Sequence, residues 1–208
     1  MKHNRRVMTG HWLLGIAFLV LTMGSASGAS EQSAQEVVRS TTEQVLAVLR
    51  KEGDGLKGNS ERLYQLIDQL ILPHFDFRKM SRWVLGRHWR KATEAQKQAF
   101  MEQFQGLLVR TYGQALIDYR DQKIVFLPVN AAAADTVVVR TRIHQPGGPD
   151  IPITYKMAME GSDWKVYDVS IDGVSLVINY RASFNQEIKR NGIDGLIRRL
   201  SSHNSKNT

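Results

Sequence analysis

Cysteine is absent from the 208-residue sequence, and so is any apolar run long enough to span a bilayer. Without cysteine no disulfide bond can form, so a packed core must supply the stability of the fold. The longest mainly apolar run, Trp12 to Met23, has twelve residues, whereas a transmembrane helix needs about 20. A membrane anchor is therefore the less favoured interpretation of this segment.

Residues 1–29 have the pattern of a secretory signal peptide. Three basic residues among the first six precede the apolar run, and small residues follow it, so that cleavage after Ala29 or Ala26 fits. No cysteine stands next to the cleavage site to carry a lipid, and we expect a soluble protein in a bacterial periplasm. Removing the segment takes away three basic residues and no acidic one, which lowers the net charge from +8 to +5. The rest suits one domain, residues 30–201, and a disordered tail, residues 202–208.

The strongest helical pattern lies between Ala92 and Tyr119. Thr93 and Gln96 form a capping box that predicts the helix start. A bulky apolar stripe then recurs every three or four residues, which indicates one buried face. Three helices are expected before it: one from a second capping box, Ser33 and Glu36, to Gly53, one from Ser60 to Pro73, and one from Asp76 to Gly86.

The period changes to two after Lys123. Alternating apolar residues predict strands at residues 123–127, 137–143, 153–159 and 164–169, joined by short turns. Helical segments at Tyr180 to Asn191 and Gly195 to Ser201 are expected to close the chain. We therefore predict an α+β fold in which a curled, four-stranded antiparallel sheet packs against a long helix and a helical lobe.

Motifs of catalysis and metal binding are incomplete. Gly173-Val174-Ser175 begins like a nucleophile elbow but lacks the second glycine, and no Walker loop is found. His74, His88 and His144 have no spacing typical of metal ligands, so each is interpreted as a surface or packing residue. Asp168 and Asp172 form a possible acid/base pair, but a strand end and an Asp-Gly turn explain them better. We expect no metal and no cofactor.

A basic cluster precedes the long helix. It holds six cations and no acid within fourteen residues: Arg78, Lys79, Arg82, Arg87, Arg90 and Lys91. Nucleic-acid binding is disfavoured for an exported, mildly basic protein. A solvated face is the simplest interpretation; the alternative is a surface for anionic headgroups or an acidic partner.

Several short sequence strings between residues 63 and 200 together resemble those of a known protein family, because of the order and spacing in which they occur. They are Pro73-His74-Phe75-Asp76-Phe77, Val84-Leu85-Gly86, Trp89-Arg90, Ala92-Thr93, Gln96, Tyr112-Gly113-Gln114-Ala115-Leu116, Tyr167-Asp168, Gly173-Val174-Ser175 and Gly192-Ile193-Asp194-Gly195-Leu196. Together they resemble the MlaC, or toluene-tolerance, family of periplasmic phospholipid-binding proteins.

The resemblance implies a non-enzymatic, monomeric carrier with an NTF2-like sheet lobe and a helical lobe, and with phospholipid as its cargo. Its partners would be an inner-membrane ABC transporter with an MCE-domain (MlaD-like) subunit and an outer-membrane lipoprotein-porin (MlaA-like) complex. Lipid shuttled between them would maintain outer-membrane asymmetry. The basic cluster described above supplies the candidate headgroup or partner surface, with Arg78, Arg82, Arg87 and Arg90.

Helix and sheet can enclose a hollow pocket or a filled core, and the residues alone favour neither; the resemblance favours the pocket. The expected acyl-chain contacts are Phe104, Leu108, Tyr112, Val139, Tyr155, Met157, Trp164 and Val166, with the headgroup near solvent. Two alternatives remain. One is an NTF2-like isomerase or hydratase that uses Asp168 with Tyr112 or Tyr155, which requires a carboxylate in the cavity. The other is an adaptor with a filled core.

Overall fold

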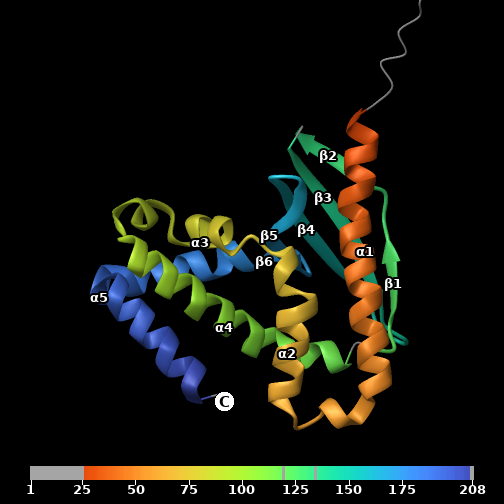
Figure 1. Cartoon of the computed structure of the whole chain (residues 1–208), viewed down its shortest axis with the longest axis horizontal. Helices are drawn as coiled ribbons and strands as arrows, with labels where there is room; N and C mark the ends of the chain where they lie inside the picture. The colour runs from red at the N-terminus through yellow and green to blue at the C-terminus, as the bar shows by residue number, and fades with distance from the viewer. Residues whose placement is uncertain (1–25, 119, 134, 207–208) are drawn as a thin grey trace, which may run out of the picture.

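The computed structural model describes residues 26–118, 120–133 and 135–206. Figure 1 shows two lobes: helix α1 crosses the face of a curled sheet in one, and α3, α5 and the first part of α4 form the other. The predicted signal peptide lies outside the described residues except for its last four, which belong to α1. Within the described ranges, no helix is both long and apolar enough to cross a membrane.

Helix α1 runs from Ala26 to Glu52, so the predicted start at Ser33 is wrong. Ser33 lies inside the helix, and its hydroxyl accepts a hydrogen bond from the Trp164 indole nitrogen at 3.0 Å instead of capping a helix end. The predicted end is correct, because the chain leaves the helix at Gly53 and enters a short 3-10 turn, η1, Gly53–Leu56.

Two shorter helices follow. Helix α2, Ser60–Leu70, is capped by Asn59, one residue before the predicted cap, whose side chain accepts the Arg62 amide at 3.1 Å. A 3-10 turn, η2 (Leu72–His74), leads to α3, Phe77–Leu85. The predicted cap of α3 is confirmed, since Asp76 accepts the Lys79 amide at 2.7 Å. Gly86 ends this helix with φ 54°, a conformation that glycine adopts without strain, and the 3-10 turn η3, Gly86–Lys91, follows.

Helix α4, Glu94–Asp118, spans both lobes. Its predicted capping box is present: the Thr93 amide donates to the Gln96 side chain at 3.0 Å, and the Gln96 amide donates to the Thr93 hydroxyl at 3.1 Å. At its other end, Gly113 lets α2 approach closely, because a Cβ at this position would lie 2.8 Å from Ile67 Cδ1.

The sheet is antiparallel and has two short strands beyond the four expected, so the predicted fold class is confirmed with a larger sheet. The expected strands are β1 (Lys123–Phe126), β3 (Thr136–His144), β4 (Ile151–Glu160) and β5 (Asp163–Ile171). The additional ones are β2 (Asn130–Ala133) and β6 (Val174–Ser175). The order is β1-β3-β4-β5-β6, and β2 also pairs with β3. The β2 sequence, Asn-Ala-Ala-Ala, has low strand propensity, and β6 has only two residues, which is why the pattern missed both.

Helix α5, Leu176–Lys206, is interrupted at Gly192, whose φ of 69° and ψ of 178° are not helical. It begins four residues before the expected Tyr180. The prediction of a disordered tail is wrong for residues 202–206, which are helical. Asn204 is buried and donates to the Gln103 carbonyl at 2.9 Å, so this last turn is held against α4.

Two apolar clusters form the core. The larger joins the sheet to α3, α5, the first half of α4 and the start of α1. The smaller joins α2 to the second halves of α1 and α4. Residues of both clusters line the cavity that lies between the lobes.

Candidate functional site: an apolar cavity between the lobes

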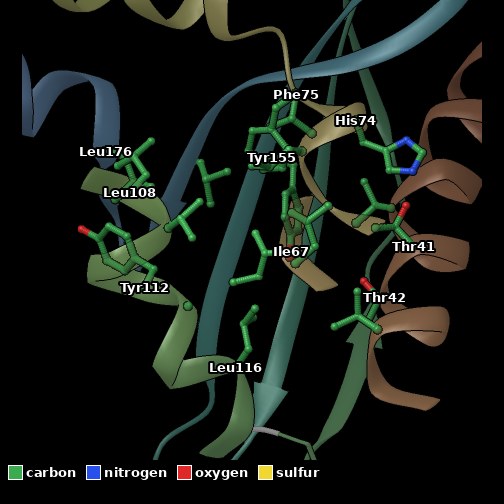
Figure 2. Close-up of a pocket in the computed structure, with 18 of the residues that line it drawn as sticks. Thr41, Thr42, Ile67, His74, Phe75, Leu108, Tyr112, Leu116, Tyr155 and Leu176 are labelled. Carbon is green, nitrogen blue, oxygen red and sulfur yellow. The ribbon is translucent and has the colours of Figure 1, made fainter. Parts of the chain in front are cut away.

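A cavity of about 300 Å³ lies where α1, α2, α4 and the sheet meet. This volume is at the lower end of the range of about 300–1,000 Å³ that small-molecule pockets span. In Figure 2, Leu108, Tyr112 and Leu116 of α4 form one wall, Thr41 and Thr42 of α1 form the opposite wall, and Tyr155 of β4 lies between them with Phe75. The interior is therefore hollow and not completely filled by side chains.

Helix α1 supplies a whole wall because its lining residues repeat every four positions. They are Val37, Val38, Thr41, Thr42, Val45, Leu46 and Leu49. A spacing of four places adjacent pairs on one helix face, turn after turn. Helix α1 therefore forms part of the site, although none of the family-like sequence strings lies within it.

The lining is apolar and contains no charged group at neutral pH. Within the described ranges, no Asp, Glu, Lys or Arg lines the cavity. Burial and the neighbouring Tyr180 raise the pKa of Tyr112 to about 12, and burial raises the pKa of Tyr155 against the opposing effect of Thr141. Burial lowers the pKa of His74, as does the charge of Lys165, so its imidazole is neutral as well. Such a lining favours hydrocarbon over a charged or polar ligand.

Asp168, the acid of the enzyme alternative, does not line this cavity. It is 3% exposed, and it accepts the Ser175 hydroxyl at 2.8 Å, the Lys156 ammonium at 3.0 Å and the Val177 amide at 3.3 Å. The Ser175 hydroxyl in turn accepts the Ile178 amide at 3.2 Å. Asp168 thus ties β4, β6 and the first turn of α5 together, which explains the early start of that helix.

The structure brings only half of the predicted acyl-chain contacts into the cavity wall. Leu108, Tyr112, Tyr155 and Val166 line it. The other four pack elsewhere. Phe104, one turn before Leu108 on α4, stacks on Phe100 and makes edge-on contacts with Tyr180 and Phe184 of α5. Val139 and Met157 are fully buried in the larger cluster, and Trp164 contacts α1 through Ser33.

A register shift explains two lining residues that the alternation missed. Lys156 pairs with Asp168, and the next residue of β4, Met157, pairs with Val166, so β5 carries one extra residue, Tyr167. A bulge of this kind reverses which side chains share a face beyond it. Val169 and Ile171 therefore line the cavity together with Val166.

The predicted basic surface lies outside the cavity, on α3 and η3. Arg78, Arg82, Arg87 and Arg90 are exposed. Arg78 lies 3.6 Å from Glu94 and over the Trp89 ring at 5.6 Å. Beside them Trp83 is 51% exposed and stacks on Tyr167. The described residues contain no cluster of histidine and carboxylate side chains suited to a metal ion.

Comparison with known proteins gives consistent results over nearly the whole described chain. The family model "MlaC protein" matches residues 39–202. Toluene tolerance protein ttg2D of Pseudomonas putida is 29% identical over 186 residues, 89% of this chain and 84% of that protein. The intermembrane phospholipid transport system binding protein MlaC of Haemophilus influenzae is 23% identical over 188 residues, 88% of this chain and 86% of that protein.

A solved structure has the same fold. The phospholipid-binding protein from Ralstonia solanacearum, determined in complex with a phospholipid, superposes with a TM-score of 0.77 and 35% identity, over 84% of this chain and 98% of that one. Because the family model matches more than half of the sequence, the chain belongs to the MlaC family.

Proposed function

We propose that this chain is a periplasmic phospholipid carrier that holds acyl chains in the cavity between its lobes. The observation that carries the proposal is the cavity lining, which is aliphatic and aromatic and is neutral at physiological pH. The names of two similar proteins support it: one belongs to an intermembrane phospholipid transport system, and the other was determined with a phospholipid bound.

The physical need for such a carrier follows from the hydrophobic effect. Each buried CH₂ group is worth about 0.8 kcal/mol, so a lipid with two long chains leaves a membrane for water very rarely. A cavity nearly as apolar as the bilayer removes most of this barrier. Transfer between carrier and membrane complexes is then close to balanced, and docking to partners sets its direction.

Within the cavity, Leu108, Tyr112, Tyr155 and Val166 are the proposed chain contacts, joined by Val169 and the four-residue repeat on α1. Phe104, Val139, Met157 and Trp164 lie behind or beside this lining in the packed core. Their proposed role is to support the wall. Lipid contact by all of these residues is a proposal that labelled-lipid cross-linking would test.

The proposed partners follow from the family. The chain would receive and deliver phospholipid between an outer-membrane lipoprotein-porin complex and an inner-membrane ABC transporter with an MCE-domain subunit, as a monomer, and thereby maintain outer-membrane lipid asymmetry. The exposed basic residues of α3 and η3 are the proposed partner surface. Cations there would speed encounter with an acidic partner, and salt would weaken this effect.

The test is lipid extraction and native mass spectrometry of protein purified from the periplasm, followed by transfer of labelled phospholipid between vesicles. We expect co-purifying phospholipid and transfer that depends on the protein. Repeated purification without phospholipid, together with no transfer, would refute the carrier function. No observation favours the enzyme alternative, since its acid is engaged with Ser175, Lys156 and α5.

A further inference from the structure

A second hollow of about 400 Å³ adjoins the apolar cavity. The two share the side chains of Val37 and His74, so the hollow lies directly beside the cavity. Its other walls come from the start of α1, the η2 turn and the hairpin between β4 and β5: Ser33, Pro73, Met159 and the residues from Ser162 to Lys165. In Figure 2, His74 lies at the α1 side of the cavity, and the same residue also lines the hollow.

The chemistry of this hollow differs from that of the cavity. It contains a cation, Lys165, and a carboxylate, Asp163, besides hydroxyl groups and the imidazole of His74. Both charges act on His74: Lys165 lowers its pKa and Asp163 raises it, while burial is the largest cause of the net lowering. The hollow is thus more polar than the cavity, and its lining includes charges of both signs.

Lys165 is held in place but keeps binding capacity. Its ammonium donates to the Pro73 carbonyl at 2.7 Å, which fixes the side chain across the η2 turn. An ammonium has three donors, so this bond leaves others for a ligand. Among the residues that the structure describes, no carboxylate lies within ion-pair distance of Lys165, and no cation lies within that distance of Asp163.

The walls of the hollow are fixed by a contact between distant parts of the chain. The Trp164 indole nitrogen donates to the Ser33 hydroxyl at 3.0 Å, which ties the hairpin to α1. Phe75 forms an isolated bridge with Val166, and the Asp76 amide donates to the Val166 carbonyl at 2.9 Å, which ties the η2 turn to β5. The hairpin that carries Asp163 and Lys165 is therefore joined by direct contacts to α1, and the η2 turn that carries His74 is joined to β5.

We propose that this hollow binds the headgroup of the carried phospholipid, with the phosphodiester against Lys165 and a headgroup amine against Asp163. The inference rests on the proposed carrier function, because a lipid whose chains fill the cavity would have its headgroup next to Val37 and His74, which also line the hollow. The remaining cavity wall offers no competing charge, since its far end, at Leu46, Leu49 and Leu116, is aliphatic. The mixed charge favours a zwitterionic headgroup such as phosphoethanolamine over a purely anionic one.

The experiment compares lipids that share chains but differ in headgroup: diacyl phosphatidylethanolamine, phosphatidylglycerol and diacylglycerol, bound to delipidated protein. K165Q should bind both phospholipids about tenfold more weakly and diacylglycerol unchanged, because only the charge-assisted bond to phosphate is lost. K165R should restore most of the affinity. D163N should weaken phosphatidylethanolamine several-fold and leave phosphatidylglycerol unchanged or bound more tightly.

Matched controls make the same charge changes elsewhere. D172N alters an exposed carboxylate at the other end of β5, and K123Q alters an exposed lysine at the start of β1; neither should change any affinity. Inorganic phosphate and glycerophosphoethanolamine without chains serve as separate ligands. Tight binding of inorganic phosphate that K165Q abolishes, with phospholipid binding unaffected, would identify a free-anion site and overturn the proposal.

Two further results would overturn it. One is equal weakening of phospholipid and diacylglycerol by K165Q, which would show that the substitution acts through the fold or the cavity. The other is unchanged phospholipid binding by both K165Q and D163N. If the unaltered protein bound none of the three diacyl lipids, the carrier function itself would fail, and the headgroup site with it.

Discussion

Replacing Val166 by tryptophan should fill the cavity and displace the cargo. Val166 lies on β5, is 3% exposed, and lines the cavity. Trp at this position adds an indole ring that is directed into a space of about 300 Å³. Because the space exists, the ring can enter it without the cost of about 1–3 kcal/mol that overpacking a filled core incurs.

The expected loss of affinity follows from the methylenes displaced. If the ring takes the place of about four CH₂ groups, at about 0.8 kcal/mol each, binding weakens by about 3 kcal/mol, or roughly two orders of magnitude in Kd. V139W is the informative comparison. Val139 is fully buried in the packed cluster and does not line the cavity, so this variant should lose stability by overpacking.

The assay is the molar ratio of phospholipid to protein after gentle purification, measured together with the melting temperature. V174W, on the 56% exposed Val174 of β6, makes the same substitution at the surface and should retain the full lipid content. A V166W protein that melts like the unaltered chain and still carries its full phospholipid content would refute the assignment of the cavity as the acyl-chain site.

Two further predictions concern single side chains. Asp168→Ala leaves Lys156 and Ser175 without their acceptor, so it should cost about 3 kcal/mol and lower the melting temperature by about 10 °C; if the folded variant lost lipid transfer at full stability, Asp168 would instead have a direct role. The folded-state pKa of His74 lies below its ordinary value, so protonation favours the unfolded chain, and the stability present above about pH 6.5 is lost as the pH falls. His74→Gln should therefore reduce the fall in melting temperature between about pH 7 and pH 5, and an identical fall in both proteins would contradict this.

Local signals in the sequence predicted most helix ends correctly. The caps at Asp76 and Thr93 and the ends at Gly53 and Gly86 depend on residues within one turn, so the pattern contains all the information needed. Ser33 shows the limit of this reasoning. Its sequence context resembles a helix cap, but its hydroxyl accepts a hydrogen bond from Trp164, which lies 131 residues away in the sequence.

The cavity lining was harder to predict because it depends on position along each element as well as on the face. Phe104 and Leu108 lie on the same side of α4, yet only Leu108 reaches the gap between the two clusters. On β5, the extra residue at Tyr167 places Val169 on the cavity side against the simple alternation. A bulge has no signature in the hydrophobic pattern of a single strand.

The cavity makes the stability of the protein depend on its cargo. A ligand that binds the folded state alone raises the free energy of unfolding, by about 4 kcal/mol when free ligand is at about a thousand times its Kd. For a chain of this size, each kcal/mol raises the melting temperature by about 2–4 °C. We therefore expect delipidated protein to melt at least 10 °C below the loaded form and to recover on addition of phospholipid; equal melting temperatures would mean that the lobes close over the empty cavity.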